Sequence, residues 1–445
     1  MRMPQVPPDV DQIWNKIKHE PQKIRQYFEK ISKLPRDIKY LHWDKLRRLS
    51  PPLSMTHEEW WFAIKWQRKP SYRKIPLYDK KGSSFVMLLE VDPIPERLHD
   101  IDLGSGGLIQ MPEQITNPET RDQYYVSSLI EEAITSSQLE GAATTRQIAK
   151  EMIKSGRKPI NRSEQMILNN FNTMQHINKL KDRELSKKLI FEIHRLVTEN
   201  TLDDPSAAGR LRKADERVSV VDMYGEVHHE PPSAKELNHR IETLCKFANG
   251  QTESGHIHPV IRSILLHFWL AYDHPFIDGN GRTARAIFYW SMLRHKYWLF
   301  EFVSISQVLL KAPAKYERAF LYTETDGNDL TYFILYHLDV IQKAVQQLHE
   351  FIQRKTVRLQ SLERDLRGMT ILNHRQRVLV SHALRHPYHR YTIQSHRTSH
   401  NVVYQTARLD LIDLENRGLL ESKKIGRKWY FTPAPKLEKK LSRLT

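Results

Sequence analysis

The sequence contains a single cysteine, Cys245, and no long uninterrupted apolar run. One cysteine excludes an internal disulfide framework and is typical of a reducing compartment, so we expect a cytoplasmic protein. The longest apolar stretch, residues 264–272, contains His267 and is too short to cross a bilayer. Residues 1–8 lack the apolar segment of a signal peptide. These absences predict a soluble protein with no membrane partner.

Acidic residues are also scarce relative to basic ones. Lys and Arg number 69 against 52 Asp and Glu, which gives a formal net charge of +17 and a pI near 9.6. This excess favours nucleotides, nucleic acid or other anionic partners, although an ordinary basic protein can have the same composition. A chain of 445 residues exceeds what one hydrophobic core usually supports, so two or three domains are expected.

The most informative stretch is residues 273–285, DHPFIDGNGRTAR. It lies between two apolar segments, 261–272 and 283–293, which are predicted to form buried helices. Gly279 and Gly281 allow the backbone to turn tightly at the start of the second helix. The free N–H groups and the dipole of a helix N-terminus attract anions. The pattern therefore predicts a phosphate-binding loop.

Side chains of the same stretch supply the chemistry. His274 is the one group there whose ordinary pKa suits a general base near neutral pH. Asp278 is a hard oxygen ligand suited to Mg²⁺ that is shared with phosphates. Arg282 and Arg285 are three residues apart, and both can contact phosphate oxygens. Each residue alone is more often structural, but together they favour a nucleotide site.

The segment from His274 to Arg285 resembles the signature of the Fic family, His-Pro-Phe-x-(Asp/Glu)-Gly-Asn-(Gly/Lys)-Arg-x-x-Arg, at every position. Most Fic proteins transfer AMP from ATP to a hydroxyl group of a target protein. The resemblance implies that His274 deprotonates a Ser, Thr or Tyr hydroxyl of the target. Asn280 and the neighbouring backbone N–H groups would hold the phosphates.

The resemblance also implies roles for the charged residues of the signature. Asp278 would hold Mg²⁺, Arg282 the triphosphate, and Arg285 its γ-phosphate. Gly281 stands where a branch that phosphorylates its targets carries Lys. AMP transfer from ATP is therefore the expected reaction.

A second resemblance lies upstream, after an apolar helical face at 126–134. Ser136, Glu140 and Gly141 match the pattern (Ser/Thr)-x-x-x-Glu-(Gly/Asn) of an inhibitory helix found in many Fic proteins. It implies that Glu140 pairs with Arg285 and withholds it from the γ-phosphate. Two alternatives stay open: Glu140 is a solvated residue at a helix end, or it orients water that removes AMP from a modified protein.

A β-hairpin is predicted at 217–229. The run containing Val218, Ser219 and Val220 alternates, and Gly225 provides a turn before residues 227–229. The hairpin resembles the Fic flap, whose edge would hold a target segment by strand addition. The alternative is an ordinary two-stranded ribbon.

Residues 369–445 are predicted to form a winged helix-turn-helix. Helices are expected around 379–384, within 391–397 and at 403–416, followed by wing strands at 419–421 and 428–431 joined by a basic turn (Lys423, Lys424, Gly426, Arg427). No acidic residue lies between 371 and 409, whereas six arginines do, which favours contact with duplex DNA. Winged helices also serve as protein-docking or dimer surfaces, so a homodimer is an alternative.

The sequence thus predicts a mainly α protein with four parts. They are a mainly helical region at 1–110, a Fic domain with its inhibitory helix at 111–345, a helical linker at 346–368 and the winged helix at 369–445. The expected function is that of an autoinhibited protein adenylyltransferase that uses ATP and Mg²⁺. The alternatives are a DNA-binding regulator whose Fic domain senses nucleotide, and a deAMPylase that acts through Glu140.

Overall fold

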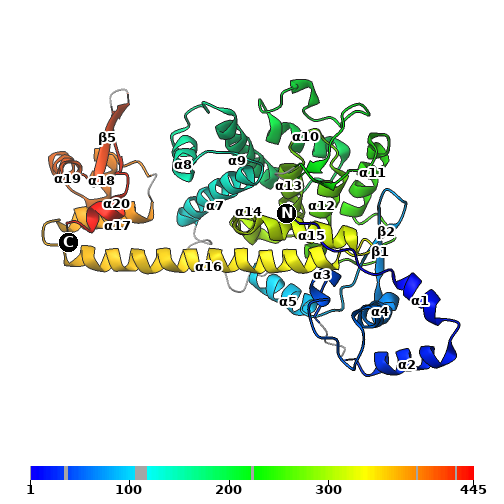
Figure 1. Cartoon of the computed structure of the whole chain (residues 1–445). Coiled ribbons are helices and arrows are strands. Elements are labelled where there is room, and N and C mark those ends of the chain that lie inside the picture. The colour runs from blue at the N-terminus through cyan, green and yellow to red at the C-terminus, as the bar shows by residue number, and fades with distance from the viewer. Residues whose placement is uncertain are drawn as a thin grey trace. The chain divides into compact units, whose positions relative to one another are not determined.

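The computed structural model describes residues 2–34, 39–105, 118–221, 225–386, 389–425 and 428–444. Over these ranges the chain is mainly helical, with three two-stranded antiparallel hairpins (Figure 1). The predicted mainly α fold class is confirmed. The chain divides into two compact units, residues 1–107 with 128–345, and residues 108–127 with 346–445. The boundaries of the four predicted parts stay predictions.

The first unit contains most of the helices. Its elements in chain order are α1 (Val10–Ile17), α2 (Pro21–Ser32), α3 (Trp43–Leu46), α4 (His57–Arg68), β1 (Arg73–Tyr78), β2 (Ser84–Met87), α5 (Ile94–Ser105), α8 (Arg146–Ser155), α9 (Arg162–Leu180), α10 (Lys187–Thr198), β3 (Val220–Val221), β4 (Val227–His229), α11 (Leu237–Ala248), α12 (Pro259–Asp273), α13 (Asn280–Arg294), α14 (Ile305–Lys311) and α15 (Pro313–Thr325). Two helices, α7 (Pro118–Leu139) and α16 (Thr331–Gly368), contain the unit boundaries.

Helices α12 and α13 form the centre of the first unit. Helix α12 starts at Pro259, because the proline ring suits the first helical position, and its apolar residues are buried on all sides. Helix α13 packs against α12, and α9 and α10 pack against α13. The loop between α12 and α13 is therefore held at both ends by core helices.

The N-terminal helices have a small core of their own. Trp61 and Phe62 of α4 are fully buried against Ile13, Ile31 and Trp43, so the aromatic-rich segment of the sequence is core. The segment predicted as a helical linker, 346–368, is the second part of α16, a continuous helix that begins at Thr331. No Pro or Gly interrupts the sequence between Thr331 and Arg367.

The second unit contains α17 (His374–Arg385), α18 (Ile393–His400), α19 (Tyr404–Asn416), β5 (Leu420–Ile425), β6 (Lys428–Pro433) and α20 (Leu437–Leu441). One apolar cluster joins these helices and the hairpin. The strands are longer than predicted: Lys423 and Lys424 pair with Tyr430 and Trp429 inside the ladder rather than in the turn. Gly426 and Arg427 lie outside the described residues.

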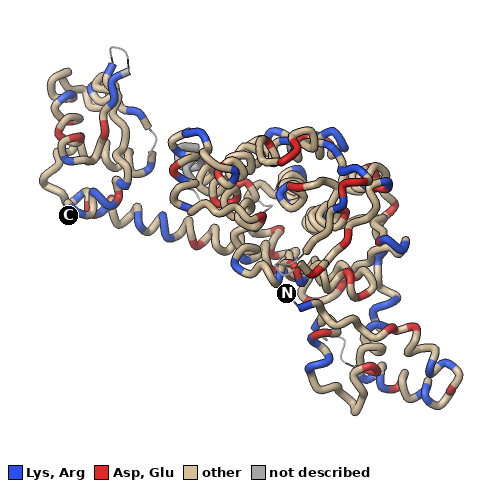
Figure 2. Tube along the Cα trace, turned by 45° about the horizontal axis from the view of Figure 1, so that its top comes forward, with Lys and Arg blue, Asp and Glu red and all other residues tan. Residues whose placement is uncertain are grey.

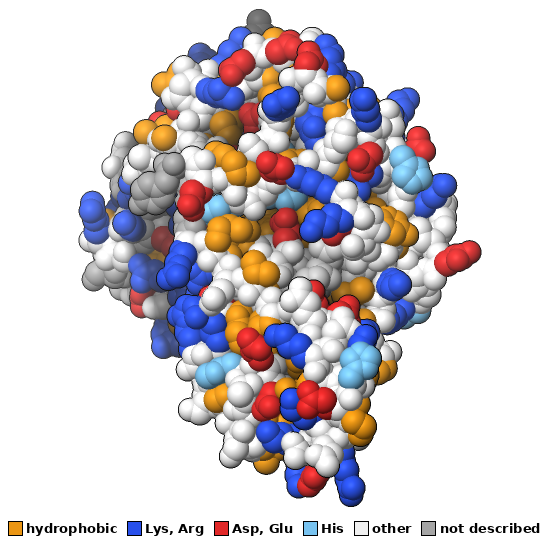
Figure 3. All heavy atoms as spheres, turned by 45° about the vertical axis from the view of Figure 1, so that its right-hand side comes forward, with side chains coloured by type: hydrophobic (Ala, Val, Ile, Leu, Met, Phe, Trp, Pro, Cys, Tyr) orange, Lys and Arg blue, Asp and Glu red, His pale blue; other side chains and the backbone are white. Residues whose placement is uncertain are grey.

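The surface shows charges of both signs. On the face in Figure 3, Lys, Arg, Asp and Glu side chains are interspersed with small apolar patches, as is usual for a face in contact with water. In the part of the chain that the structure describes, no helix combines the length and the hydrophobicity needed to span a bilayer.

Candidate active site

The conformation of the loop between α12 and α13 depends on the side-chain amide of Asn280 and on Gly279. His274 ends α12 with a left-handed backbone (φ 45°), and Gly279 starts α13 in the same region (φ 82°). The Asn280 side chain accepts from the N–H of Phe276 at 2.9 Å and donates to its carbonyl oxygen at 2.8 Å. A Cβ on Gly279 would lie 2.6 Å from Cγ2 of Thr198. The loop therefore needs glycine at 279 and an amide at 280.

His274 is held in the form that a general base requires. Its Nδ1 lies 3.2 Å from the carbonyl oxygen of Ala271, which can only accept, so Nδ1 carries the hydrogen and Nε2 keeps a free lone pair. Burial lowers the pKa of His274 to about 4, so the ring is neutral at physiological pH. The ring lines a cavity of about 210 Å³.

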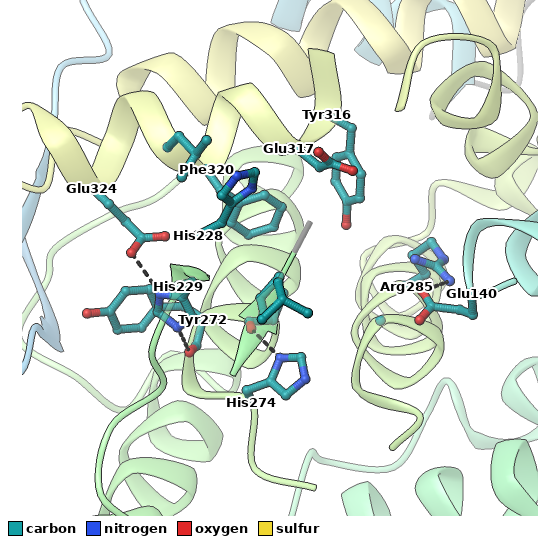
Figure 4. Close-up of a pocket in the computed structure, with 15 residues that line it drawn as sticks. Glu140, His228, His229, Tyr272, His274, Arg285, Tyr316, Glu317, Phe320 and Glu324 are labelled. Carbon is teal, nitrogen blue, oxygen red and sulfur yellow. Dashed lines mark hydrogen bonds and ion pairs between the residues drawn. The ribbon is translucent and has the colours of Figure 1, made fainter. Parts of the chain in front are cut away.

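The cavity is lined by residues of β3, β4, α12, α13 and α15, together with Glu140 and His274 (Figure 4). The sequence-predicted residues that line it are His274, Gly281, Arg285, Glu140 and Val220. Among the described residues no side chain caps α13, and the uncapped N–H groups of a helix N-terminus attract an anion. The cavity thus combines a neutral imidazole, a helix N-terminus and a guanidinium group.

Arg285 is engaged by the end of α7. It donates from Nε to Oγ of Ser136 at 2.8 Å, and from Nη2 to the Ser136 carbonyl oxygen at 2.9 Å and to Oε1 of Glu140 at 2.8 Å. Gly141 follows with φ 89°, a backbone that turns the chain away from the helix. A Cβ at Gly281 would overlap with the Glu140 carboxylate. Glu140 therefore occupies the space directly over the start of α13.

Two signature side chains point into the protein instead of the cavity. Arg282 is buried, donates from Nη1 to the carbonyl oxygen of Val197 at 2.8 Å and lies 3.4 Å from Asp278. The Asn280 amide is occupied by the Phe276 backbone. In this conformation both residues shape the loop, and Gly281 and Arg285 are the residues of α13 that line the cavity.

Asp278 lies at the edge of the site. Its side chain is 37% exposed, and its two oxygens lie 3.4 Å from Arg282 and Arg162. Among the residues that the structure describes there is no group of three or more His, Cys, Asp or Glu side chains placed to hold a metal. Mg²⁺ is commonly coordinated by one or two protein carboxylates, with phosphate and water oxygens as its other ligands. The single carboxylate of Asp278 is compatible with such a site.

The hairpin covers one side of the cavity, but it is shorter than the sequence indicated. Strand β3 begins at Val220, so Val218 and Ser219 precede it and do not line the cavity. The strand predicted from 217 is therefore wrong in its first half: among the described residues, 216–219 have no partner in the ladder, although their sequence alternates like a strand. Residues 222–224 lie outside the described ranges.

His229 of β4 ties this hairpin to the helices. Its Nδ1 lies 2.7 Å from Oε2 of Glu324 on α15, and its Nε2 lies 2.8 Å from the carbonyl oxygen of Tyr272 on α12. Figure 4 shows this chain of contacts beside His274. The hairpin is thereby fixed next to the imidazole of His274.

Sequence reasoning missed the wall that α15 provides. Tyr316, Phe320 and Glu324 line the cavity. In the sequence this segment shows only the residue spacing of a helix, which does not indicate a role in a site. Sequence reasoning also missed Glu132 on α7, which is buried and accepts from the Tyr289 hydroxyl at 2.8 Å; burial raises its pKa. Glu132 also accepts from the Ser306 backbone N–H at 3.2 Å, which anchors the helix that carries Ser136.

Comparisons with known proteins agree on one segment of the chain. Residues 184–292 match the Fic/DOC family, and this segment includes the loop that starts at His274. The chain is 32% identical over 126 residues to the proteins named "Protein adenylyltransferase Fic" of Drosophila grimshawi and of Drosophila ananassae. That alignment covers 28% of this chain and 24% or 23% of those relatives, so the chain matches about a quarter of their length.

A solved structure extends the likeness in fold. The crystal structure of a Fic family protein from Desulfovibrio desulfuricans G20 aligns with 78% of this chain and 97% of its own, with a TM-score of 0.51 and 17% identity. The chain therefore has a Fic-like fold and is distantly related to protein adenylyltransferases. The family match does not include residues 136–141 or the second unit.

Proposed function

We propose that this chain is a protein adenylyltransferase that transfers AMP from Mg·ATP to a hydroxyl group of a target protein and of itself. The observation that carries the proposal is that Nε2 of His274, the N-terminus of α13 and Arg285 share one cavity. A base for a hydroxyl and a binding place for phosphates are both needed for this reaction, and they lie within one pocket.

The chain's own residues divide the work of the transfer. Nε2 of His274 accepts the proton of a Ser, Thr or Tyr hydroxyl, whose oxygen forms a bond to the α-phosphorus while the bond to pyrophosphate breaks. The N–H groups at the start of α13 donate to the phosphate oxygens as negative charge develops there. Asp278 would hold Mg²⁺, which, when bound, neutralises charge on the triphosphate.

Autoinhibition by Glu140 is part of the proposal. Arg285 is nearly fully buried and already donates to the Glu140 carboxylate, so a γ-phosphate in the same place would have to displace it. The carboxylate also covers Gly281, where the phosphates would approach α13. An anion at this position repels the triphosphate, and the wild-type protein is therefore expected to react slowly.

The hairpin supplies the proposed docking edge for the target. Val220 and Val221 line the cavity and expose 36% and 53% of their surface. A target segment that pairs with β3, or with Val218 and Ser219 before it, would bring its hydroxyl group to His274 by main-chain hydrogen bonds.

One observation favours a second activity on the same site. The Glu140 carboxylate faces the cavity that contains His274, and carboxylates of this kind can orient water. Removal of AMP from a modified protein would then require Glu140, whereas transfer would be slowed by it. AMP release from a pre-modified target should stop in Glu140→Gly, and continued release would exclude this activity.

Labelled ATP tests the main proposal. The protein is incubated with Mg²⁺ and ATP labelled at either the α- or the γ-phosphate, alone and with cell lysate. Label should transfer to protein from the α-position only, and His274→Asn, a residue that tolerates the left-handed backbone, should abolish the transfer. If nucleotide binds but no label transfers even in Glu140→Gly, the Fic domain acts as a nucleotide sensor and the proposal is wrong.

A further inference from the structure

The second unit carries a large share of the chain's positive charge. Residues 369–445 contain fifteen Lys and Arg against five Asp and Glu, a net charge of +10 out of the +17 of the whole chain. Charge of one sign concentrated in a small domain is the electrostatic footprint of a polyanion-binding surface. We propose that α18, α19 and the β5–β6 hairpin form a surface that binds duplex DNA.

The exposed side of helix α19 is polar and basic around one aliphatic residue, Leu409. Its buried side, formed by Ala407, Leu411 and Leu414, packs into the apolar cluster of the unit. Tyr404, Gln405 and Arg408 lie on the exposed side. Asn401, left-handed at the end of α18, reverses the chain and so places α19 across α18. One helix with a free polar face, supported by another, is suited to the major groove.

Two acidic residues of α19, Asp410 and Asp413, are paired with neighbouring side chains. Asp410 accepts from Arg375 at 2.7 Å, from Asn373 at 2.7 Å and from His396 at 3.1 Å, and it is buried. Asp413 accepts from Gln376 and Arg417, each at 2.8 Å. These carboxylates hold α17, α18 and α19 together. The residues of α19 before Asp410 include no acidic residue.

The hairpin adds cations beside the helix. Lys423, Lys424 and Lys428 are exposed at the far end of the ladder, and Trp429 keeps 47% of its surface exposed. Figure 2 shows Lys and Arg along the hairpin. Its other end is tied to the domain, because Tyr391 pairs with Phe431 by two backbone hydrogen bonds of 2.8 Å. A rigid basic hairpin next to an exposed helix suits phosphate contacts on the strand beside the groove.

The chemistry of the face distinguishes duplex DNA from other polyanions. The major groove of B-DNA is about 12 Å wide and admits a helix, whereas that of A-form RNA is too narrow. A membrane surface would require a broad apolar side on α19 to insert, but the exposed Val403 and Leu409 are interspersed with Gln405 and Arg408, so no broad apolar side forms. The surface therefore fits duplex DNA best.

The test is fluorescence anisotropy of the full chain with a labelled DNA duplex of mixed sequence and with an RNA duplex of the same length, at several salt concentrations. The exposed cations proposed to contact phosphates are Arg397 of α18, Arg408 of α19, and Lys423 and Lys428 on one face of the hairpin. If all four contact phosphates, log K falls with log salt at a slope of about −3.6, which weakens binding by roughly 150-fold between 50 and 200 mM.

A matched pair of double variants locates the surface. Lys423 and Lys428 lie on one face of the hairpin, because Lys428 is the ladder partner of Ile425 and strand side chains alternate between faces. Lys423→Ala with Lys428→Ala should flatten the slope by about 1.8, which corresponds to the loss of two phosphate contacts. Lys439→Ala with Arg443→Ala removes the same charge from exposed positions of α20 and the turn after it, and should leave the slope unchanged. Absence of binding at 50 mM salt, equal loss in both pairs, or RNA bound as tightly as DNA would overturn the proposal. No arm uses ATP, so the outcome is independent of the proposed adenylyltransferase activity.

Discussion

Replacing Glu140 with glycine tests whether the ion pair with Arg285 restrains the reaction. The Arg285 side chain is 2% exposed and that of Glu140 is 26% exposed, so water screens the pair only in part. A hydrogen bond to a charged group contributes about 1.5–3 kcal/mol to stability. If the γ-phosphate must break this bond to bind productively, its removal accelerates the reaction by roughly 10- to 150-fold.

The assay is the initial rate of self-labelling with α-labelled ATP at saturating Mg²⁺. A matched control comes from the same helix: Glu131 pairs with Arg146 and Lys150, and neither partner lines the cavity. Glu131→Gln removes a carboxylate from α7 without touching Arg285, so its rate should equal that of the wild type. An unchanged rate in Glu140→Gly, or an equal rise in Glu131→Gln, would refute the inhibitory role of Glu140.

Four further outcomes follow from the site, and the first three are measured in Glu140→Gly. His274→Asn should lower the labelling rate by about 10²- to 10⁴-fold, as loss of a general base does, with an unchanged melting temperature. Because burial lowers the pKa of His274 to about 4 and the base must be neutral, the rate should stay flat from pH 8 to pH 6 and fall only as the pH approaches 4. Asp278→Ala should raise the Mg²⁺ concentration at half-maximal rate, whereas a metal dependence equal to that of the parent would remove Asp278 as a ligand. In the otherwise wild-type chain, Asn280→Ala should lower the free energy of unfolding in urea by about 1–3 kcal/mol, because it leaves the buried Phe276 backbone groups unpaired.

The part of the site that depends on local pattern was predictable from the sequence. Apolar segments on both sides of residues 274–279 indicated two buried helices, and the glycines indicated the turn between them; α12 and α13 have these positions. The resemblance to the inhibitory pattern implied that Glu140 pairs with Arg285. The structure places them 2.8 Å apart, and the inhibitory role itself stays a prediction.

Features that depend on distant partners were not predictable. Arg282 points inward because the Val197 carbonyl, 85 residues away, accepts its hydrogen bond. The spacing of the residues within 274–285 gives no information about this distant acceptor. The wall formed by Tyr316 and Phe320 was missed for a related reason: the period of a helix shows that a face is apolar, but not which cavity it meets. The predicted strand containing Val220 is longer than the observed one, because the alternation of apolar and polar residues continues beyond the residues that pair in the hairpin.

The most direct test of AMP transfer is the intact mass of the Glu140→Gly protein after incubation with Mg·ATP. We expect a new species heavier by one AMP, or by a whole number of AMP groups, and no such species when His274→Asn is added to the same chain. An unchanged mass in the Glu140→Gly protein, or an increase that corresponds to phosphate alone, would contradict it.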